Sequence, residues 1–309
     1  MKIRSALLFL FIVSIEQSFA LDEKTLSLAN SIAIADVHMH LRNGHDGNYY
    51  REVMKKNNVL WGGAVGGTFK DDPLKIKAEL GNQYIAAVGQ KEFFGVLFSA
   101  GEKGLYDLEQ PLFKKLFSYA EPAFKTGQLR GFGEIHINNI TPFGPKRDQR
   151  KIELTSPVVM KMFDIANRYN GFVQIHTMAS SDIKTLISVA AKYSNTKIIL
   201  SHCMFGASTD QVAYILSSKS NIFCELSGAG PTHFNNERFY NQYGIKEEWR
   251  ILIERFPTRF MLGTDPCCGL ENRYDDLVLE FRKYLLPYLK EQTMKLVANG
   301  NAKRIFNLK

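Results

Sequence analysis

Two histidines separated by a single residue lie at the end of the first apolar run after the N-terminal segment. His38 ends the strand expected over residues 32–38, Asp36 precedes it by two residues, and His40 follows it by two. Residues two apart in a strand point to the same face, so the two imidazoles can meet at one point. Paired imidazoles are common zinc ligands, but a lone His-x-His motif also occurs by chance in loops. The pair therefore indicates a metal only if further ligands lie nearby.

Side chains of the same ligand type end four later predicted strands. They are Glu134, His176, His202 and Asp265. The carboxyl ends of the strands in an α/β barrel surround one mouth, so these side chains and the histidine pair should converge there. A mixed set of imidazoles and carboxylates favours zinc, or a similar divalent cation such as manganese or iron, over calcium, which prefers oxygen ligands.

The alternative is that each of these residues caps a helix or is a hydrogen-bonded core residue. Asp265 follows a Gly-Thr pair and could cap the next helix, and a histidine that ends a strand can be satisfied within the core. Burying six such polar groups at one mouth would nevertheless be costly without a metal or a network to satisfy them. The combined pattern predicts a metal site.

Short β-rich runs alternate with longer segments of helical period, and these elements must position the candidate ligands. The predicted strands cover residues 32–38, 59–65, 93–98, 129–137, 172–176, 197–202, 221–226 and 259–264. The helical stretches with the clearest apolar spacing cover residues 156–169, 181–193 and 274–289. Eight strand-helix pairs predict an α/β fold, a (β/α)8 barrel with a mainly parallel sheet and a C-terminal helical tail. Residues 138–155 are expected to form a long loop at the barrel mouth.

The N-terminus predicts a signal peptide over residues 1–20. A basic start precedes an apolar run over residues 6–15, and small residues stand before the expected cleavage point after Ala20. That run is too short to cross a hydrocarbon core, which takes roughly 20 residues. We expect an exported protein, periplasmic or secreted, whose mature chain, residues 21–309, is a single barrel domain without a membrane anchor.

Composition excludes several classes of protein. The chain is 45% hydrophobic and 23% charged, which is ordinary for a globular domain and excludes a disordered or fibrous protein. The formal net charge is +8, but the basic residues are scattered and do not interleave with aromatic residues as on a nucleic-acid-binding surface. We therefore expect a small-molecule substrate and no nucleic-acid partner, and the oligomeric state stays open.

The chain has four cysteines, and their spacing does not indicate a metal site. They are Cys203, Cys224, Cys267 and Cys268. An even number in an exported chain is compatible with disulfides, but the pairing cannot be deduced from the sequence. The adjacent pair Cys267-Cys268 is awkward to bridge to itself.

The motifs around the candidate ligands resemble the amidohydrolase superfamily, and especially its amidohydrolase-related branch. They are Asp-Val-His-Met-His at 36–40, Gly-Phe-Gly-Glu at 131–134, Gln-Ile-His at 174–176, Leu-Ser-His at 200–202, Leu-Gly-Thr-Asp at 262–265 and the closing Asn-Gly-Asn-Ala-Lys-Arg-Ile-Phe at 299–306. The likeness runs from about residue 34 to residue 306. It implies a deformed TIM barrel that binds one or two divalent metals.

The resemblance also implies roles for the ligands. In its two-metal form, one metal is held by His38, His40 and Asp265, the other by His176 and His202, and Glu134 bridges them. In one-metal relatives the fifth-strand histidine joins the first metal and the sixth-strand His202 polarises the substrate. The sequence leaves the metal count open. Because such a cation activates water, Asp265 is the expected general base and proton donor, with His202 as the second catalytic candidate.

Loops after the strand ends supply candidates for substrate binding. The residues are Arg42, His233 and Arg273, together with His45. His136 lies two residues beyond Glu134, so it either shares the face of that carboxylate or points to solvent.

Three functions fit these observations. The first is a metal-dependent hydrolase that cleaves an ester, lactone, amide or phosphoester bond. The second is a metal-dependent non-oxidative decarboxylase or hydratase of an aromatic or unsaturated acid, which a Glu134 turned away from a single metal would favour. The third is a non-catalytic metal-binding or ligand-binding barrel, although a degenerate site should have lost at least one of the six ligands.

Overall fold

A computed structural model describes most of the chain after the N-terminal segment. The described residues are 21–42, 44–67, 72–140, 146, 149–179, 181–228, 230–233 and 236–309. The expected signal peptide, residues 1–20, lies outside the described residues, as does part of the expected loop over 138–155. Within the described ranges, none of the helices combines the length and apolarity needed to cross a bilayer.

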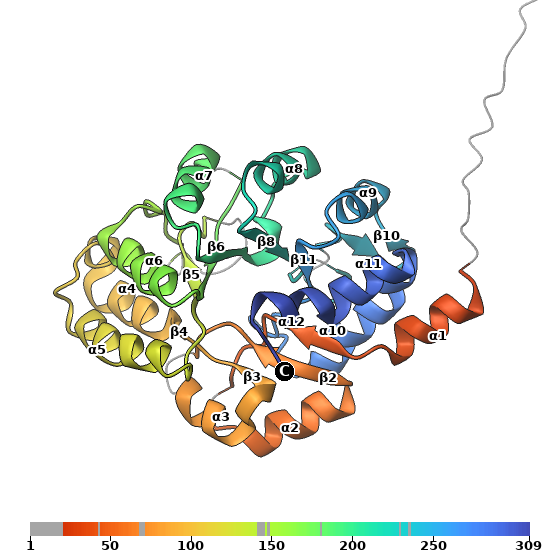
Figure 1. Cartoon of the computed structure of the whole chain (residues 1–309), viewed down its shortest axis with the longest axis horizontal. Helices are drawn as coiled ribbons and strands as arrows, with labels where there is room; N and C mark the ends of the chain where they lie inside the picture. Colours follow the sequence, from red (N-terminus) through yellow and green to blue (C-terminus); the bar gives the residue numbers. More distant parts are fainter. Residues whose placement is uncertain are drawn as a thin grey trace, which may run out of the picture.

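Parallel strands form the centre of the molecule, and helices surround them (Figure 1). One sheet has the order β11-β8-β7-β6-β5-β4, and a second has the order β1-β2-β3. The strands are β1 (Ile34–Asp36), β2 (Val59–Gly63), β3 (Tyr84–Ile85), β4 (Ala87–Gly89), β5 (Gly131–His136), β6 (Phe172–His176), β7 (Lys197–Leu200), β8 (Ile222–Glu225) and β11 (Phe260–Met261). A separate antiparallel hairpin joins β9 (Tyr240–Asn241) to β10 (Gly244–Ile245).

The two sheets join into one deformed (β/α)8 barrel. β3 and β4 are one stretch of chain interrupted at Ala86, and they pair with β2 and β5 respectively. On the other side, the backbone N–H of Val37 donates to Leu262 (2.9 Å) and that of Asp265 donates to His38 (2.9 Å). These bonds connect the end of β1 to the end of β11. The predicted fold is therefore confirmed.

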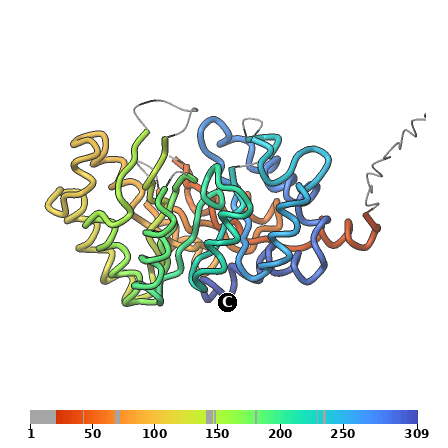
Figure 2. The backbone as a smooth tube through the Cα atoms, turned by 90° about the horizontal axis from the view of Figure 1, so that it is seen from above, coloured from red at the N-terminus to blue at the C-terminus, as the bar shows by residue number. Residues whose placement is uncertain are grey.

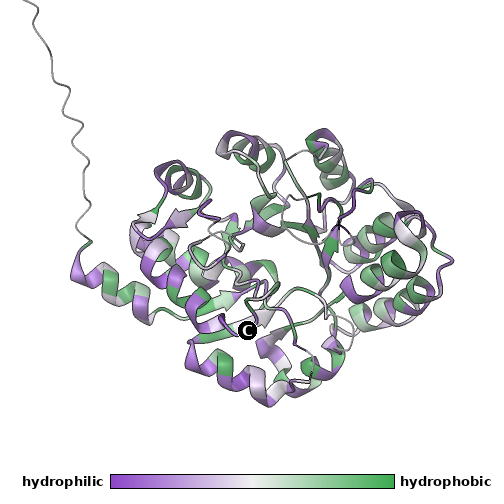
Figure 3. Cartoon of the chain, turned by 180° about the vertical axis from the view of Figure 1, so that it is seen from behind, coloured by the Kyte–Doolittle hydropathy of each residue, from purple (hydrophilic) through white to green (hydrophobic). Residues whose placement is uncertain are grey.

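The helices cover the outside of the barrel, with hydrophobic and hydrophilic residues segregated along them (Figure 3). Their bounds are α1 (Glu23–Ser31), α2 (Gly47–Lys56), α3 (Pro73–Leu80), α4 (Gln90–Gly104), α5 (Pro111–Lys125), α6 (Pro157–Arg168), α7 (Ile183–Lys192), α8 (Thr209–Ser218), α9 (Glu247–Arg255), α10 (Tyr274–Glu280), α11 (Glu291–Lys295) and α12 (Asn301–Ile305). Side-chain caps such as Ser156 and Asp182 fix where α6 and α7 begin. The predicted helices over 156–169 and 181–193 are confirmed.

One predicted strand is wrong. Residues 93–98 lie inside α4, where Phe93, Val96 and Leu97 are buried. This spacing of i, i+3 and i+4 is helical, but the aromatic and β-branched residues of the segment are also typical of a strand. The third barrel strand is instead the stretch of β3 and β4, whose residues are buried on both faces.

The end of the chain closes one end of the barrel. Ala302, Ile305 and Phe306 pack into the same hydrophobic cluster as Phe172 and Phe223 of the barrel strands. Asn301 donates to the carbonyls of Pro257 and Phe260 at the start of β11. A side view places the C-terminus at one edge of the molecule (Figure 2). Because this end of the barrel is filled by side chains, the carboxyl ends of the strands form the open mouth.

Candidate metal centre

Asp36 anchors the strand that delivers the histidine pair. Its carboxylate accepts hydrogen bonds from the backbone N–H of Thr264 (2.9 Å), the hydroxyl of Tyr274 (2.9 Å) and the backbone N–H of His38 (3.1 Å). Asp36 therefore connects the end of β1 to the segment that follows β11 and to α10. This network fixes the position of His38 relative to Asp265.

The first three candidate ligands lie close together at the barrel mouth. His38 Nε2 and His40 Nε2 are 3.2 Å apart. Asp265 Oδ1 lies 3.1 Å from His40 Nε2 and 3.4 Å from His38 Nε2. All three side chains are buried. Three ligand atoms thus face one another in a space shielded from bulk water.

Glu134 lies between this group and two further histidines. Its Oε2 is 3.4 Å from His38 Nε2. Its Oε1 is 3.0 Å from His176 Nδ1 and 3.5 Å from His202 Nε2. One carboxylate thus faces both histidine groups, which is the position a bridging ligand needs. The structure brings all six predicted ligands together.

These residues fit a divalent cation. In the described part of the chain, three triads offer ligand atoms that all lie within 4.8 Å of one another: His38-His40-Glu134, Glu134-His176-His202 and His38-His202-Glu225. Among the described atoms, His176 Nε2 and Asp265 Oδ1 are buried and have no hydrogen-bond partner. Because buried polar atoms are normally satisfied, a cation bound by these residues would supply the partner of both atoms and would also balance the buried carboxylates.

Burial and mutual charge set the protonation of the cluster. Burial opposes a charged ring at His38, but the carboxylates of Asp265 and Glu134 outweigh it and raise the pKa of His38 well above its usual value. Conversely, the positive charge of His38 overcomes the effect of burial and holds the pKa values of Glu134 and Asp265 well below their usual range. Both carboxylates are therefore ionised at neutral pH, as ligands of a cation must be.

The sequence analysis missed Glu225, which orients two of the histidines. Its Oε1 lies 3.2 Å from His38 Nδ1 and accepts hydrogen bonds from the His202 backbone N–H (2.7 Å) and the Ser227 hydroxyl (2.6 Å). A carboxylate on Nδ1 leaves Nε2 of the same ring available to a cation. The only sequence signal was an acidic residue within the apolar run over residues 222–226, and the structure shows that this residue, at the end of β8, is fully buried.

His136 faces the cluster and not the solvent. Its Nε2 lies 3.0 Å from Glu134 Oε2, and its ring stacks on that of His176 with centroids 4.7 Å apart. Burial lowers the pKa of His136 to about 3, so the ring is neutral at physiological pH. The alternation of side chains along β5 explains this, because Glu134 and His136 are two residues apart.

The three candidates for substrate binding lie in different surroundings. His233 is buried beside the cluster, with Nε2 3.4 Å from the backbone oxygen of Asp265. The guanidinium of Arg42 donates to the hydroxyl of Tyr49 (3.2 Å), which stacks on His45. The side chain of Arg273 is half exposed and forms an ion pair with Asp276. Of the three, only His233 is shown in contact with a ligand residue, and all three roles stay predictions.

The cysteines near the mouth are of two kinds. Cys203, directly after His202, forms a disulfide with Cys224 on β8. Cys267 and Cys268 are free, with sulfurs 2.7 Å apart. The disulfide joins two neighbouring strand ends that carry His202 and Glu225, a pairing that the sequence could not reveal.

Comparisons with known proteins agree with this fold. The model of a family described as amidohydrolase matches residues 43–308. A protein assigned as a 2-pyrone-4,6-dicarboxylic acid hydrolase from Pseudomonas putida is 14% identical, with 90% of this chain and 98% of that chain covered and a TM-score of 0.57. A probable hydrolase of the same designation from Acinetobacter baumannii, solved with citric acid bound, is 13% identical, with 89% and 100% covered and a TM-score of 0.51.

A further solved structure is an uncharacterised TIM-barrel protein from Bordetella bronchiseptica. It is 12% identical, with 84% of this chain and 82% of that chain covered and a TM-score of 0.51. At such low identity these structures establish the fold alone. No curated protein sequence is significantly similar to this chain.

Proposed function

The chain belongs to the amidohydrolase family, and from this premise we propose that it is a metal-dependent hydrolase of a small molecule. The observation that carries the proposal is the position of Glu134, whose two oxygens lie 3.4 Å from His38 Nε2 and 3.0 Å from His176 Nδ1. A carboxylate between two histidine groups suits a pair of divalent cations, and zinc is the first candidate for such ligands.

The proposed ligands divide into two groups around that carboxylate. One cation would be held by His38, His40 and Asp265, the other by His176 and His202, with Glu134 shared. Such cations supply Lewis acidity, which activates water near neutral pH and polarises the oxygen of the bond to be cleaved. The bond is an ester, lactone, amide or phosphoester.

Asp265 is the proposed general base. Its Oδ1 faces His40 at 3.1 Å, and its Oδ2 lies 3.9 Å from His202 Nε2, so the carboxylate reaches both groups of ligands. The carboxylate of Asp265 is ionised at neutral pH because its pKa is lowered, and an ionised carboxylate is the form that accepts a proton. It then holds that proton for the leaving group.

The orientation of Glu134 also favours hydrolysis over the alternatives. A decarboxylase or hydratase would be favoured by a Glu134 turned away from a single metal, yet its carboxylate lies among the histidines. A barrel without chemistry would be expected to have lost ligands, whereas all six converge.

The test is turnover by protein loaded with metal. Metal-free protein would be reconstituted with zinc or manganese and offered esters, lactones, amides and phosphoesters. We expect metal-dependent hydrolysis that Asp265→Asn reduces at least about 100-fold, because it removes the base. Asp210→Asn, on an exposed turn of α8, is the matched control and should leave the rate unchanged. Release of carbon dioxide from an acid, or no turnover of any of these classes, would contradict the proposal.

A further inference from the structure

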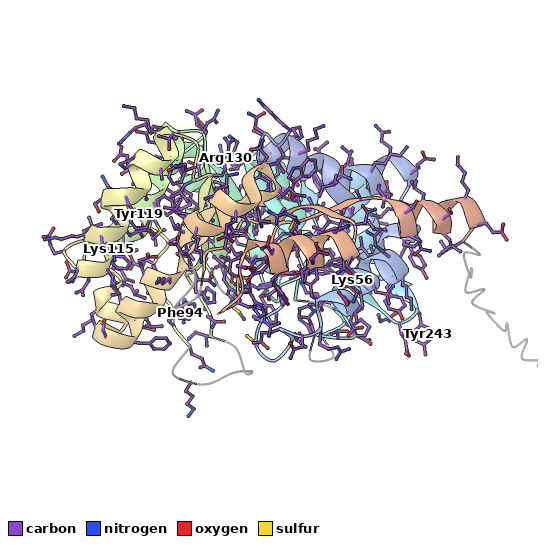
Figure 4. The ribbon with its side chains drawn as sticks, turned by 90° about the horizontal axis from the view of Figure 1, so that it is seen from below. Lys56, Phe94, Lys115, Tyr119, Arg130 and Tyr243 are labelled. Atoms are coloured by element: carbon purple, nitrogen blue, oxygen red, sulfur yellow. A yellow bond between two sulfur atoms is a disulfide. The ribbon has the colours of Figure 1, made fainter. Side chains whose placement is uncertain are left out.

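A second pocket lies at the closed end of the barrel, away from the metal centre. Its volume is about 410 Å³, and residues at the amino ends of β5, β6 and β7 line it together with α12. Figure 4 shows Arg130, one of the lining residues, on the opposite face of the molecule from Phe94. The ring of Phe94 contacts that of His136 beside the metal centre (centroids 5.1 Å apart). The pocket and the metal centre are therefore separate sites.

The pocket concentrates positive charge. Arg130, Lys197 and Arg304 line it, and no Asp or Glu does among the residues described. Within the described part of the chain, Lys197 Nζ donates only to neutral oxygens of Asn170, the backbone oxygen (2.6 Å) and Oδ1 (2.8 Å). Arg304 likewise donates to the Thr258 carbonyl (2.6 Å). Because none of the described lining residues is a carboxylate that could neutralise these cations, an anion in the pocket would be attracted by them.

A fourth cationic group lies directly behind this cluster. The guanidinium groups of Arg259 and Arg304 share the ring of Phe223, at 5.5 and 5.9 Å from its centroid. Arg259 donates to the backbone oxygens of Ser220 (2.6 Å) and Ile222 (2.9 Å), so it too has neutral partners. The positive potential of the pocket is thereby increased.

The remaining wall of the pocket is aromatic. Phe124, Tyr169, Phe172 and Phe306 contribute to it. Phe172 and Phe306 pack edge to face, with centroids 4.9 Å apart, which fixes the floor. Phe124, Phe172 and Phe306 are buried, so the partly exposed ring of Tyr169 is the aromatic surface that a ligand's organic body could contact.

We infer that this pocket binds a small organic phosphomonoester. Its double negative charge suits a pocket lined by Arg130, Lys197 and Arg304 better than the single charge of a carboxylate would, and its organic body can lie against Tyr169. The volume is that of an ordinary small-molecule site. The inference is independent of the hydrolysis proposed for the metal centre.

Calorimetry of the full, zinc-loaded chain with phenylphosphonate tests the inference, because this probe carries the charge and ring of a phosphomonoester but cannot be hydrolysed. We expect binding that weakens with added salt, and a Kd raised at least about tenfold in Lys197→Gln and in Arg304→Gln. Arg304 is exposed, so its variant should fold even if Lys197→Gln does not. Lys303→Gln, on the same helix but outside the pocket, should leave the Kd within about twofold.

Binding should persist in Asp265→Asn, which separates this pocket from the metal centre. Three results would overturn the inference: no binding at millimolar phenylphosphonate, equal affinity in Arg304→Gln and the unaltered protein, or tighter binding of benzoate than of phenylphosphonate. None of them bears on whether the metal centre hydrolyses a substrate.

Discussion

At the scale of single residues, Glu225 shows how a side chain that is not among the proposed ligands can still control them. Its carboxylate lies 3.2 Å from His38 Nδ1 and accepts from the backbone of His202 at 2.7 Å. Glu225→Gln keeps the shape but removes the charge that fixes the His38 tautomer. We expect zinc affinity to fall about 10-fold to 100-fold. Competition with a chelating dye measures this, and an unchanged affinity would contradict the orienting role.

Protonation of the histidines gives a second prediction at this scale. The pKa values of His38 and His202 are raised, against the effect of burial, by neighbouring carboxylates. Because their raised pKa values extend protonation of these rings to higher pH, protons compete with the metal below those values and cease to compete above them. Zinc affinity should therefore rise with pH, and binding should release protons. Calorimetry in buffers of different ionisation enthalpy measures the release, and a zero value would refute it.

At the scale of elements, the loop after β8 is shaped by a glycine at the site. Gly228 has φ +68, and a Cβ there would lie 2.6 Å from His202 Nδ1. Gly228→Ala should displace the His202 ring, lower zinc content and cost about 1 kcal/mol or more of stability. Gly81→Ala is the matched control, because Gly81 also has positive φ but nothing within 4 Å. Gly81→Ala should lose stability but keep its zinc content. Equal zinc content in the two variants would contradict this account.

The elements also show what the sequence could predict. Strand ends that carry ligands were recognisable because apolar runs stop at residues such as His176 and Asp265. The strands of a parallel barrel all end at the same mouth, so these ligands could be expected to lie close together. The strand predicted over 93–98 was wrong because Phe93, Val96 and Leu97 are equally compatible with a strand by composition. Glu225 was missed because its role depends on distances between strands, which no local pattern encodes.

At the scale of the whole molecule, we propose that the chain is exported. The predicted cleavage after Ala20 and the disulfide between Cys203 and Cys224 both suit an oxidising compartment. The exported protein should begin at Leu21, and Cys203 and Cys224 should resist alkylation while Cys267 and Cys268 react. Mass spectrometry of the protein from its native host measures both features. An exported chain that retains Lys2, or four reactive thiols, would contradict the proposal.

The whole molecule also separates its two proposed sites. α12 fills the closed end of the barrel with Ile305 and Phe306, so the metal centre lies at one end and the basic pocket at the other. The sequence identified the first site because its ligands occur in motifs. It did not identify the second, because Arg130, Lys197 and Arg304 are far apart along the chain and become neighbours only through the closure of the barrel.

The central claim is that Glu134 joins two groups of histidines around divalent cations, and metal stoichiometry tests it most directly. Elemental analysis of protein dialysed against zinc should give about two ions per chain for the unaltered protein and for Glu248→Gln, an exposed control on α9, and at most about one for Glu134→Gln. No bound metal in the unaltered protein, or full zinc content in Glu134→Gln, would contradict the account.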